Sequence, residues 1–200
     1  LGIGTSHTTA TNAEGRRLHA VNPEEREEII IAGQTQYICS TMHNVKQISA
    51  GNCYSSALKE DGTVWNWGFG TSGQIGNSAS TTQVLPTKVS NITNITKISA
   101  GGYQELALDS DGNVWTWGRN KYSQIGHSGG DQYTPYKVNG IPKAIKIAAG
   151  SNSTMIVTEK NQIYSWGLNS NGQLGIGGSS SNKDYFSKVE FTNPENILTV

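Results

Sequence analysis

The chain has 200 residues, in which 15 lysines and arginines balance 15 aspartates and glutamates, with 24 glycines and 5 tryptophans. The balanced charge excludes the broadly basic surface that is typical of a non-specific nucleic-acid binder. Two cysteines without zinc-ligand spacing exclude a disulfide or zinc scaffold, and no apolar run reaches the 18 or so residues of a membrane-spanning helix.

Residues 1–47 carry weak traces of a repeat. Residues 30–33 (IIAG) resemble an element found three more times downstream, but the turn and tryptophan strand that follow it elsewhere are missing before residue 48. The segment is either a decayed repeat or the product of a deletion or gene-model error, and both explanations stay open. Residues 22–25 (NPEE) predict a single helical turn, because asparagine caps a helix and proline suits its first position.

Three clear repeats follow, which we place at residues 48–97, 98–146 and 147–200. Each begins with an Ile-x-Ala-Gly element, at residues 48–51, 98–101 and 147–150. A turn and a tryptophan-containing strand come about ten residues later, at 61–68 (DGTVWNWG), 111–118 (DGNVWTWG) and 161–167 (NQIYSWG). A glutamine-glycine element closes the pattern, at 73–76 (GQIG), 123–126 (SQIG) and 172–175 (GQLG).

The turn and the tryptophans predict local structure. Asp-Gly between two short strands predicts a β-hairpin with a type I′ turn, in which both central residues need positive φ. Trp65 and Trp67 lie two residues apart, so on a strand they share a face. The glycine after the second tryptophan lets the backbone approach a neighbour closely. The repeat markers are Gly51, Trp65, Trp67, Gly68, Gly101, Trp115, Trp117, Gly118, Gly150, Trp166 and Gly167.

About four short strands per 50 residues, with almost no helical periodicity, predict an all-β protein built from β-propeller blades. A linear β-solenoid of the same period is the alternative.

The quoted elements closely resemble the regulator-of-chromosome-condensation repeat, and residues 172–177 (GQLGIG) match its closing element in full. The resemblance covers residues 48–200 well and 1–47 weakly. It implies a closed seven-bladed propeller, of which this chain supplies a fragment of three to four blades in one domain. One departure is consistent, because the family often has a histidine four residues after the alanine of Ile-x-Ala-Gly. That slot holds Gln36, Tyr54, Gln104 and Ser153.

Residues that could carry chemistry are few. Residues 109–113 (DSDGN) begin like a calcium loop but lack its glycine and glutamate, so a hairpin turn explains them better. The four histidines (His7, His19, His43 and His127) have no metal-ligand spacing. We therefore predict a protein that is not an enzyme and has no cofactor or metal.

Loops at one rim of a propeller are the expected binding surface, because rigid scaffolds commonly present function on loops. The tip after the second tryptophan strand combines Arg119, Lys121 and Tyr122, a composition favoured at interfaces. The long loops add Tyr133, Tyr136, Tyr185 and Phe186 to these candidate partner-binding residues.

The resemblance implies a protein-interaction scaffold that binds its partner through rim loops. Guanine-nucleotide exchange on a Ran-like small GTPase and chromatin binding are the alternatives. The regular repeat spacing shows no inserted wedge for exchange, and the zero net charge disfavours nucleic acid or chromatin. We expect a protein partner, no membrane insertion, and an intracellular location, cytoplasmic or nuclear.

Overall fold

The computed structural model describes residues 10–11, 17–18, 26–31, 34–39, 42–179 and 182–190. Sixteen strands and no helix occur in this part of the chain. The helical turn predicted at residues 22–25 lies outside it.

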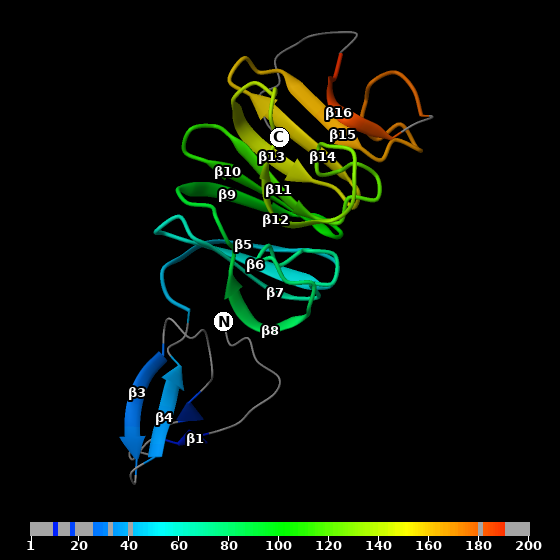
Figure 1. The fold of residues 1–200 in the computed structure, drawn as a ribbon. Helices are drawn as coiled ribbons and strands as arrows, with labels where there is room; N and C mark the ends of the chain where they lie inside the picture. Colours follow the sequence, from blue (N-terminus) through cyan, green and yellow to red (C-terminus); the bar gives the residue numbers. More distant parts are fainter. Residues whose placement is uncertain are drawn as a thin grey trace.

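Three four-stranded antiparallel sheets follow one another along the chain, and we call them blades 1, 2 and 3 (Figure 1). Blade 1 contains β5 (Val45–Ala50), β6 (Tyr54–Lys59), β7 (Val64–Gly68) and β8 (Gln83–Lys88). Blade 2 contains β9 (Ile95–Ala100), β10 (Gln104–Asp109), β11 (Val114–Gly118) and β12 (Gln132–Lys137). Blade 3 contains β13 (Ala144–Ala149), β14 (Ser153–Thr158), β15 (Ile163–Gly167) and β16 (Lys183–Lys188).

Within each blade the strands pair in chain order, each with the strand before and after it. The strands of one repeat therefore pair with one another, whereas a parallel solenoid would pair each strand with its counterpart in the next repeat. The blades stack face to face in Figure 1, and their first strands β5, β9 and β13 are neighbours. The all-β propeller-blade prediction is thus confirmed, and the solenoid is excluded.

Two antiparallel strand pairs precede the blades in the sequence. β1 (Ala10–Thr11) pairs with β2 (Arg17–Leu18), and β3 (Arg26–Ile31) pairs with β4 (Gln34–Cys39). The two isoleucines of the IIAG element end strand β3, much as the Ile-x-Ala-Gly elements end β5, β9 and β13. β3 and β4 thus form an antiparallel pair, as the first two strands of each blade do.

The hydrophobic cores lie between blades. Leu58 and Val64 of blade 1 form one buried cluster with Ile98 and Trp117 of blade 2, and Trp115 packs against it. Val114 of blade 2 joins a second cluster with residues of blade 3 that include Ile156 and Trp166. Trp115 and Trp117 therefore face the same side, as their spacing predicts. Burial of this apolar area between faces is the main force that holds the blades together.

The position of a blade in the stack decides how deeply equivalent residues are buried. Ile98 is 3% exposed because it packs against blade 1, whereas its counterpart Ile48 is 64% exposed. Trp117 and Trp166 are fully buried, but Trp67 is only half-buried. Equivalent residues are therefore buried to different extents in the three blades.

The hairpins between the second and third strands form where the Asp-Gly elements predict them, but the turn type differs from the prediction. Gly62 and Gly112 have positive φ, while Asp61 and Asp111 do not. The amide of Gly62 donates to the Lys59 carbonyl at 3.0 Å, and the amide of Lys59 donates to the Thr63 carbonyl at 2.9 Å. This is the pattern of a type I turn followed by a left-handed residue, and type I′ was the wrong prediction.

Candidate partner-binding rim

Two kinds of connection meet at one end of every blade. One is the short turn between the first and second strands, at residues 51–53, 101–103 and 150–152. The other is the long loop after the third strand, described at residues 69–82, 119–131 and 168–179. In blade 2 the amide of Arg119 donates to the Tyr103 carbonyl at 2.8 Å, and blades 1 and 3 repeat this bond from Phe69 and Leu168. We call this end the turn rim.

The glutamine of each Gly-Gln-Ile-Gly element holds the long loop in a fixed conformation. Its Oε1 accepts the amide two residues upstream, at 2.9 Å for Gln74, 2.8 Å for Gln124 and 2.9 Å for Gln173. In blade 2, Asn120 adds a brace, because its Oδ1 accepts the Ile125 amide at 3.0 Å and its Nδ2 donates to the His127 carbonyl at 3.0 Å. Internal bonds of this kind make the loop a preorganised surface.

The same loop receives the tryptophan of the next blade. Trp117 Nε1 donates to the Gln74 carbonyl at 3.0 Å, and Trp166 Nε1 donates to the Gln124 carbonyl at 2.9 Å. We call this contact the tryptophan clamp. Gly76 lies beside it, and a Cβ at this position would lie 2.8 Å from Trp117 Nε1. The glutamine-glycine motif is therefore structural, since it both folds a loop and accepts the neighbouring blade.

A small polar and aromatic surface joins blades 1 and 2 at the turn rim. Asn52 Nδ2 donates to the Tyr103 hydroxyl at 2.8 Å, and the Arg119 guanidinium lies 5.4 Å from the centre of the Tyr103 ring. Lys121 is exposed, with its Nζ 5.5 Å from the centre of the Tyr122 ring. Such cation–aromatic contacts are worth about 0.5–1 kcal/mol at exposed sites. We call Asn52, Tyr103, Arg119, Lys121 and Tyr122 the rim patch.

The structure places the sequence-predicted candidates in two groups. Arg119, Lys121 and Tyr122 lie on the long loop of blade 2, as predicted. The other four do not lie on loops, because Tyr133 and Tyr136 belong to β12 and Tyr185 and Phe186 belong to β16. That placement was wrong, since these mixed polar and aromatic stretches form the outer strands of blades 2 and 3.

Two of these four aromatic residues are committed to packing. Tyr136 packs edge-on against His127 at 4.6 Å between ring centres, and Phe186 packs against Tyr164 at 5.8 Å. Both also contact the core between blades 2 and 3. Tyr133 donates weakly to the Thr71 carbonyl of blade 1 at 3.4 Å, and Tyr185 is 72% exposed.

Sequence reasoning missed two members of the rim patch. Tyr103 and Asn52 occupy the short turns directly after Gly101-Gly102 and Gly51, and their only signal is a polar or aromatic residue beside turn glycines. Their contact crosses between blades, so it depends on how the blades stack.

The calcium-like aspartate of the second hairpin caps its own turn. Asp109 Oδ1 accepts the amides of Asp111 at 3.0 Å and Asn113 at 2.8 Å, and Oδ2 accepts Trp115 Nε1 at 2.9 Å. Burial alone would raise the pKa of Asp109, but these hydrogen bonds outweigh it and the pKa is lowered. Both carboxylate oxygens of Asp109 therefore already accept hydrogen bonds. In the described ranges no cluster of histidine, cysteine and carboxylate side chains could hold a metal ion.

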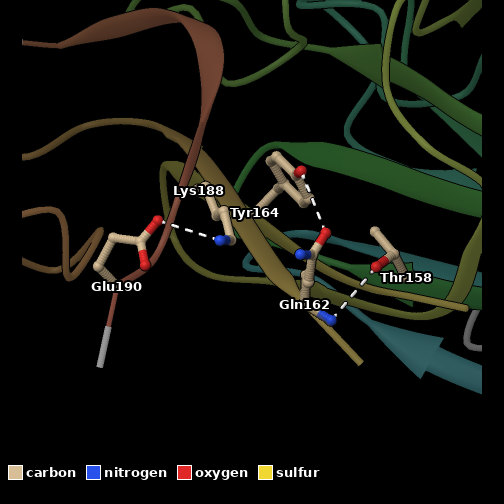
Figure 2. Close-up of polar contacts among 5 residues, drawn as sticks. All are labelled: Thr158, Gln162, Tyr164, Lys188 and Glu190. Atoms are coloured by element: carbon tan, nitrogen blue, oxygen red, sulfur yellow. Dashed lines mark hydrogen bonds and ion pairs between the residues drawn. The ribbon is translucent and has the colours of Figure 1, made fainter. Parts of the chain in front are cut away.

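The opposite end of the blades, the hairpin rim, carries ordinary surface contacts. In blade 3 the Tyr164 hydroxyl lies 3.5 Å from Gln162 Oε1, and Lys188 Nζ lies 3.2 Å from Glu190 Oε1 (Figure 2). Both partners of the ion pair are well exposed, so the pair contributes little to stability. Among the described residues no helix has the length and apolarity needed to cross a bilayer.

Stacked four-stranded meanders with connections displayed at a common rim define the chain as part of a β-propeller. The family model of the Regulator of chromosome condensation (RCC1) repeat matches residues 61–108, 111–157 and 160–197, well over half of the sequence. The chain belongs to the RCC1 repeat family.

Known proteins that resemble this chain in sequence or in fold are longer than it. The human X-linked retinitis pigmentosa GTPase regulator is 33% identical over 87 residues, which are 44% of this chain and 8% of the regulator. Prp20p from Saccharomyces cerevisiae has a similar fold, with a TM-score of 0.70 and 24% identity over 80% of this chain. Human WBSCR16 gives a TM-score of 0.69 and 22% identity over the same share. The chain spans about two fifths of each of these two structures.

Proposed function

We propose that the chain is a protein-interaction scaffold whose partner binds the turn rim, with the rim patch at the centre of the contact. The observation that carries this proposal is that Asn52 and Tyr103, from two different blades, meet in one hydrogen bond beside Arg119. The rim patch takes its residues from blades 1 and 2. The tryptophan clamp holds these two blades together, and the loop glutamine fixes the conformation of the long loop that carries part of the patch.

The chemistry of the patch supports a protein partner. Tyrosine and arginine are enriched among the residues that dominate binding energy at protein interfaces. Tyr103, Arg119 and Tyr122 are half-buried, so little side-chain entropy remains to be lost when a partner covers them. Because the net charge of the chain is zero, no long-range electrostatic field of one sign attracts the partner. Attraction then depends on local groups such as those of the rim patch.

Photo-crosslinking tests this proposal. Benzoylphenylalanine is placed at Lys121 of the full chain, with the matched control at Lys160, which is exposed at the hairpin rim. In a lysate of the source organism we expect a discrete protein crosslink from position 121 that falls at least tenfold when Arg119 and Tyr122 are replaced by alanine. Equal crosslinking from both positions, or no dependence on these two residues, would contradict it.

Binding and nucleotide exchange on a small GTPase is the second candidate. It is favoured because one relative is a GTPase regulator and because the Prp20p structure was described together with binding to Gsp1p and histones. An exchange factor must bind the nucleotide-free GTPase more tightly than the loaded one. Release of a fluorescent GDP from Ran should then accelerate in proportion to added chain. Unchanged release, together with no binding to nucleotide-free Ran, would remove this candidate.

The histone part of that comparison can be tested separately. Reconstituted nucleosomes are titrated with the chain at two salt concentrations. Chromatin binding through phosphates would weaken steeply with salt, whereas a protein contact at the rim patch would change little. We expect no salt-dependent DNA retention.

A further inference from the structure

A carboxyl group is enclosed between blades 1 and 2. Glu105 lies on β10 and is 0% exposed, and the residues facing it, Tyr54 and Ser56, belong to β6 of blade 1. Neither of its carboxyl oxygens has a hydrogen bond of normal geometry to a described residue. An ionised carboxylate in such a place would be strongly destabilising, so the group is neutral in the closed structure.

The hydroxyls of Tyr54 and Ser56 face Glu105 but offset the cost of a negative charge there only in part, because burial has the larger effect. The Tyr54 hydroxyl donates to the Gln104 carbonyl at 2.5 Å and is thereby committed. Ser56 Oγ, Gln74 Nε2 and Gln104 Oε1 are buried without a hydrogen-bond partner in the described structure. The interface is therefore polar, but its hydrogen bonds are incompletely made.

Blade 3 has a neutral residue at the same position. Glu105 pairs with Trp117 across its sheet, and Thr154 pairs with Trp166 in the same register. Thr154 Oγ1 donates to the Gln124 carbonyl at 2.8 Å, so its polar group is satisfied. The two interfaces share one architecture and differ in a single titratable group at this position.

Burial raises the pKa of Glu105 to about 8, although the hydroxyls of Tyr54 and Ser56 act in the opposite direction. The pKa of Tyr54 is also raised, first by burial and then by Glu105, so the tyrosine stays neutral over the same range. Tyr54 is the titratable side chain that faces Glu105. The lysines on neighbouring strands β5, β8 and β9 are exposed: Lys46, Lys88 and Lys97.

We propose that the neutral carboxyl of Glu105 is a proton-controlled lock on the interface between blades 1 and 2, and that loss of its proton opens this interface while blades 2 and 3 stay closed. Opening would separate Asn52 from Tyr103 and so divide the rim patch.

The direction of the pH effect follows from proton linkage. The closed interface holds the proton more tightly than the open one, in which Glu105 returns to its ordinary pKa near 4.5. Between about pH 4.5 and pH 8 the closed state binds more protons, so its stability falls as the pH rises. The opening constant should grow by up to roughly tenfold per pH unit in this window and level off above it.

Hydrogen exchange of individual amides tests the lock in the full chain. The amide of Ala100 donates to Ser49 Oγ across blades 1 and 2, and the amide of Ala149 donates to Ser99 Oγ across blades 2 and 3. After correction for intrinsic exchange, protection of Ala100 should fall by roughly tenfold or more between pH 6 and pH 8. Protection of Ala149 should change much less.

Variants identify the group. Glu105→Gln should remove the pH dependence at Ala100, and Glu105→Thr, which copies Thr154, should do the same if the glutamine does not fold. Glu159→Gln alters an exposed carboxylate and should leave the wild-type profile unchanged. Equal slopes at Ala100 and Ala149 in the wild type, or a slope at Ala100 that survives both substitutions, would overturn the proposal. The comparison of Ala100 with Ala149 in the wild-type chain tests the proposal even if neither Glu105 variant folds.

Discussion

The two interfaces of the blade stack carry the same framework with different polar contents. Both contain a tryptophan clamp, and in both a serine hydroxyl of one blade accepts an amide of the next. The first interface adds the neutral Glu105, while the second has Thr154 with its hydrogen bond made. The repeat motif therefore fixes how blades dock, and residues beside the motif set how each interface responds to its surroundings.

The residues at the position where the family often has histidine form hydrogen bonds between blades. Tyr54 donates to the Gln104 carbonyl, and Gln104 Nε2 donates in turn to the carbonyls of Gly150 at 2.9 Å and Ser153 at 3.2 Å. These side chains link three blades through main-chain carbonyls. Tyrosine and glutamine in this slot therefore connect neighbouring blades.

Removing the tryptophan clamp between blades 2 and 3 should cause the largest loss in the free energy of unfolding. It should make this second interface less stable than the first. Trp166→Ala deletes a fully buried indole and its bond to the Gln124 carbonyl, for an expected loss of about 3–5 kcal/mol in the free energy of unfolding. Urea unfolding measures it. Trp67→Ala is the matched control and should cost much less, because Trp67 is half-buried. Equal losses would show that inter-blade burial is not what the tryptophans contribute.

Crowding the first clamp should have the next largest effect. Gly76→Ala places a methyl group against the Trp117 indole at a position with φ of 74°, for an expected loss of about 2–3 kcal/mol. Gly177 has the same φ and nothing within 4 Å of its Cβ position, so Gly177→Ala should cost only the backbone strain of about 1 kcal/mol. Thermal unfolding of both variants separates contact from strain, and identical values would argue against the close approach.

A smaller effect is expected from the hydroxyl that distinguishes the second interface. Thr154→Val removes the bond to the Gln124 carbonyl but leaves that carbonyl paired with Trp166, so the loss should be about 1 kcal/mol or less. Its signature is that the loss does not vary between pH 5 and pH 8. A pH-dependent loss, measured by urea unfolding, would mean that the two interfaces do not differ as described.

The smallest expected change in the free energy of unfolding comes from the exposed ion pair of blade 3. Lys188→Ala should change the free energy of unfolding by about 0.5 kcal/mol or less, because both partners are well exposed. The measurement is repeated in high salt, where the difference should shrink further. A loss above about 1 kcal/mol would show that the outer strand contributes more than its surface position indicates.

Much of the fold could be predicted from the sequence because each repeat contains the local signals for the pairing of its own strands. Tryptophans two residues apart and Asp-Gly turns are local signals, and they placed the second and third strands correctly. The type I′ turn was wrong because one left-handed residue, Gly62 or Gly112, suffices in these turns. Residues near Tyr133 and Tyr185 looked like loops because an outer strand has only one partner and tolerates polar residues and proline.

The candidate site was less predictable. Arg119, Lys121 and Tyr122 could be found because they follow a marked strand. Asn52 and Tyr103 come from different repeats, and the buried position of Glu105 depends on which face of β10 meets blade 1. Both facts arise from inter-blade packing, which no single repeat encodes.

The central claim is that one buried carboxyl makes the first interface sensitive to protons, and the free energy of unfolding of the full chain measured against pH tests it most directly. The pKa of Asp109 is lowered, so its charge is already present throughout pH 5–8 and adds no slope there. We predict that wild-type stability falls by on the order of 3–4 kcal/mol from pH 5 to pH 8 and that Glu105→Gln removes this fall. A wild-type profile that is flat or rising, or one that the substitution leaves unchanged, would contradict the account.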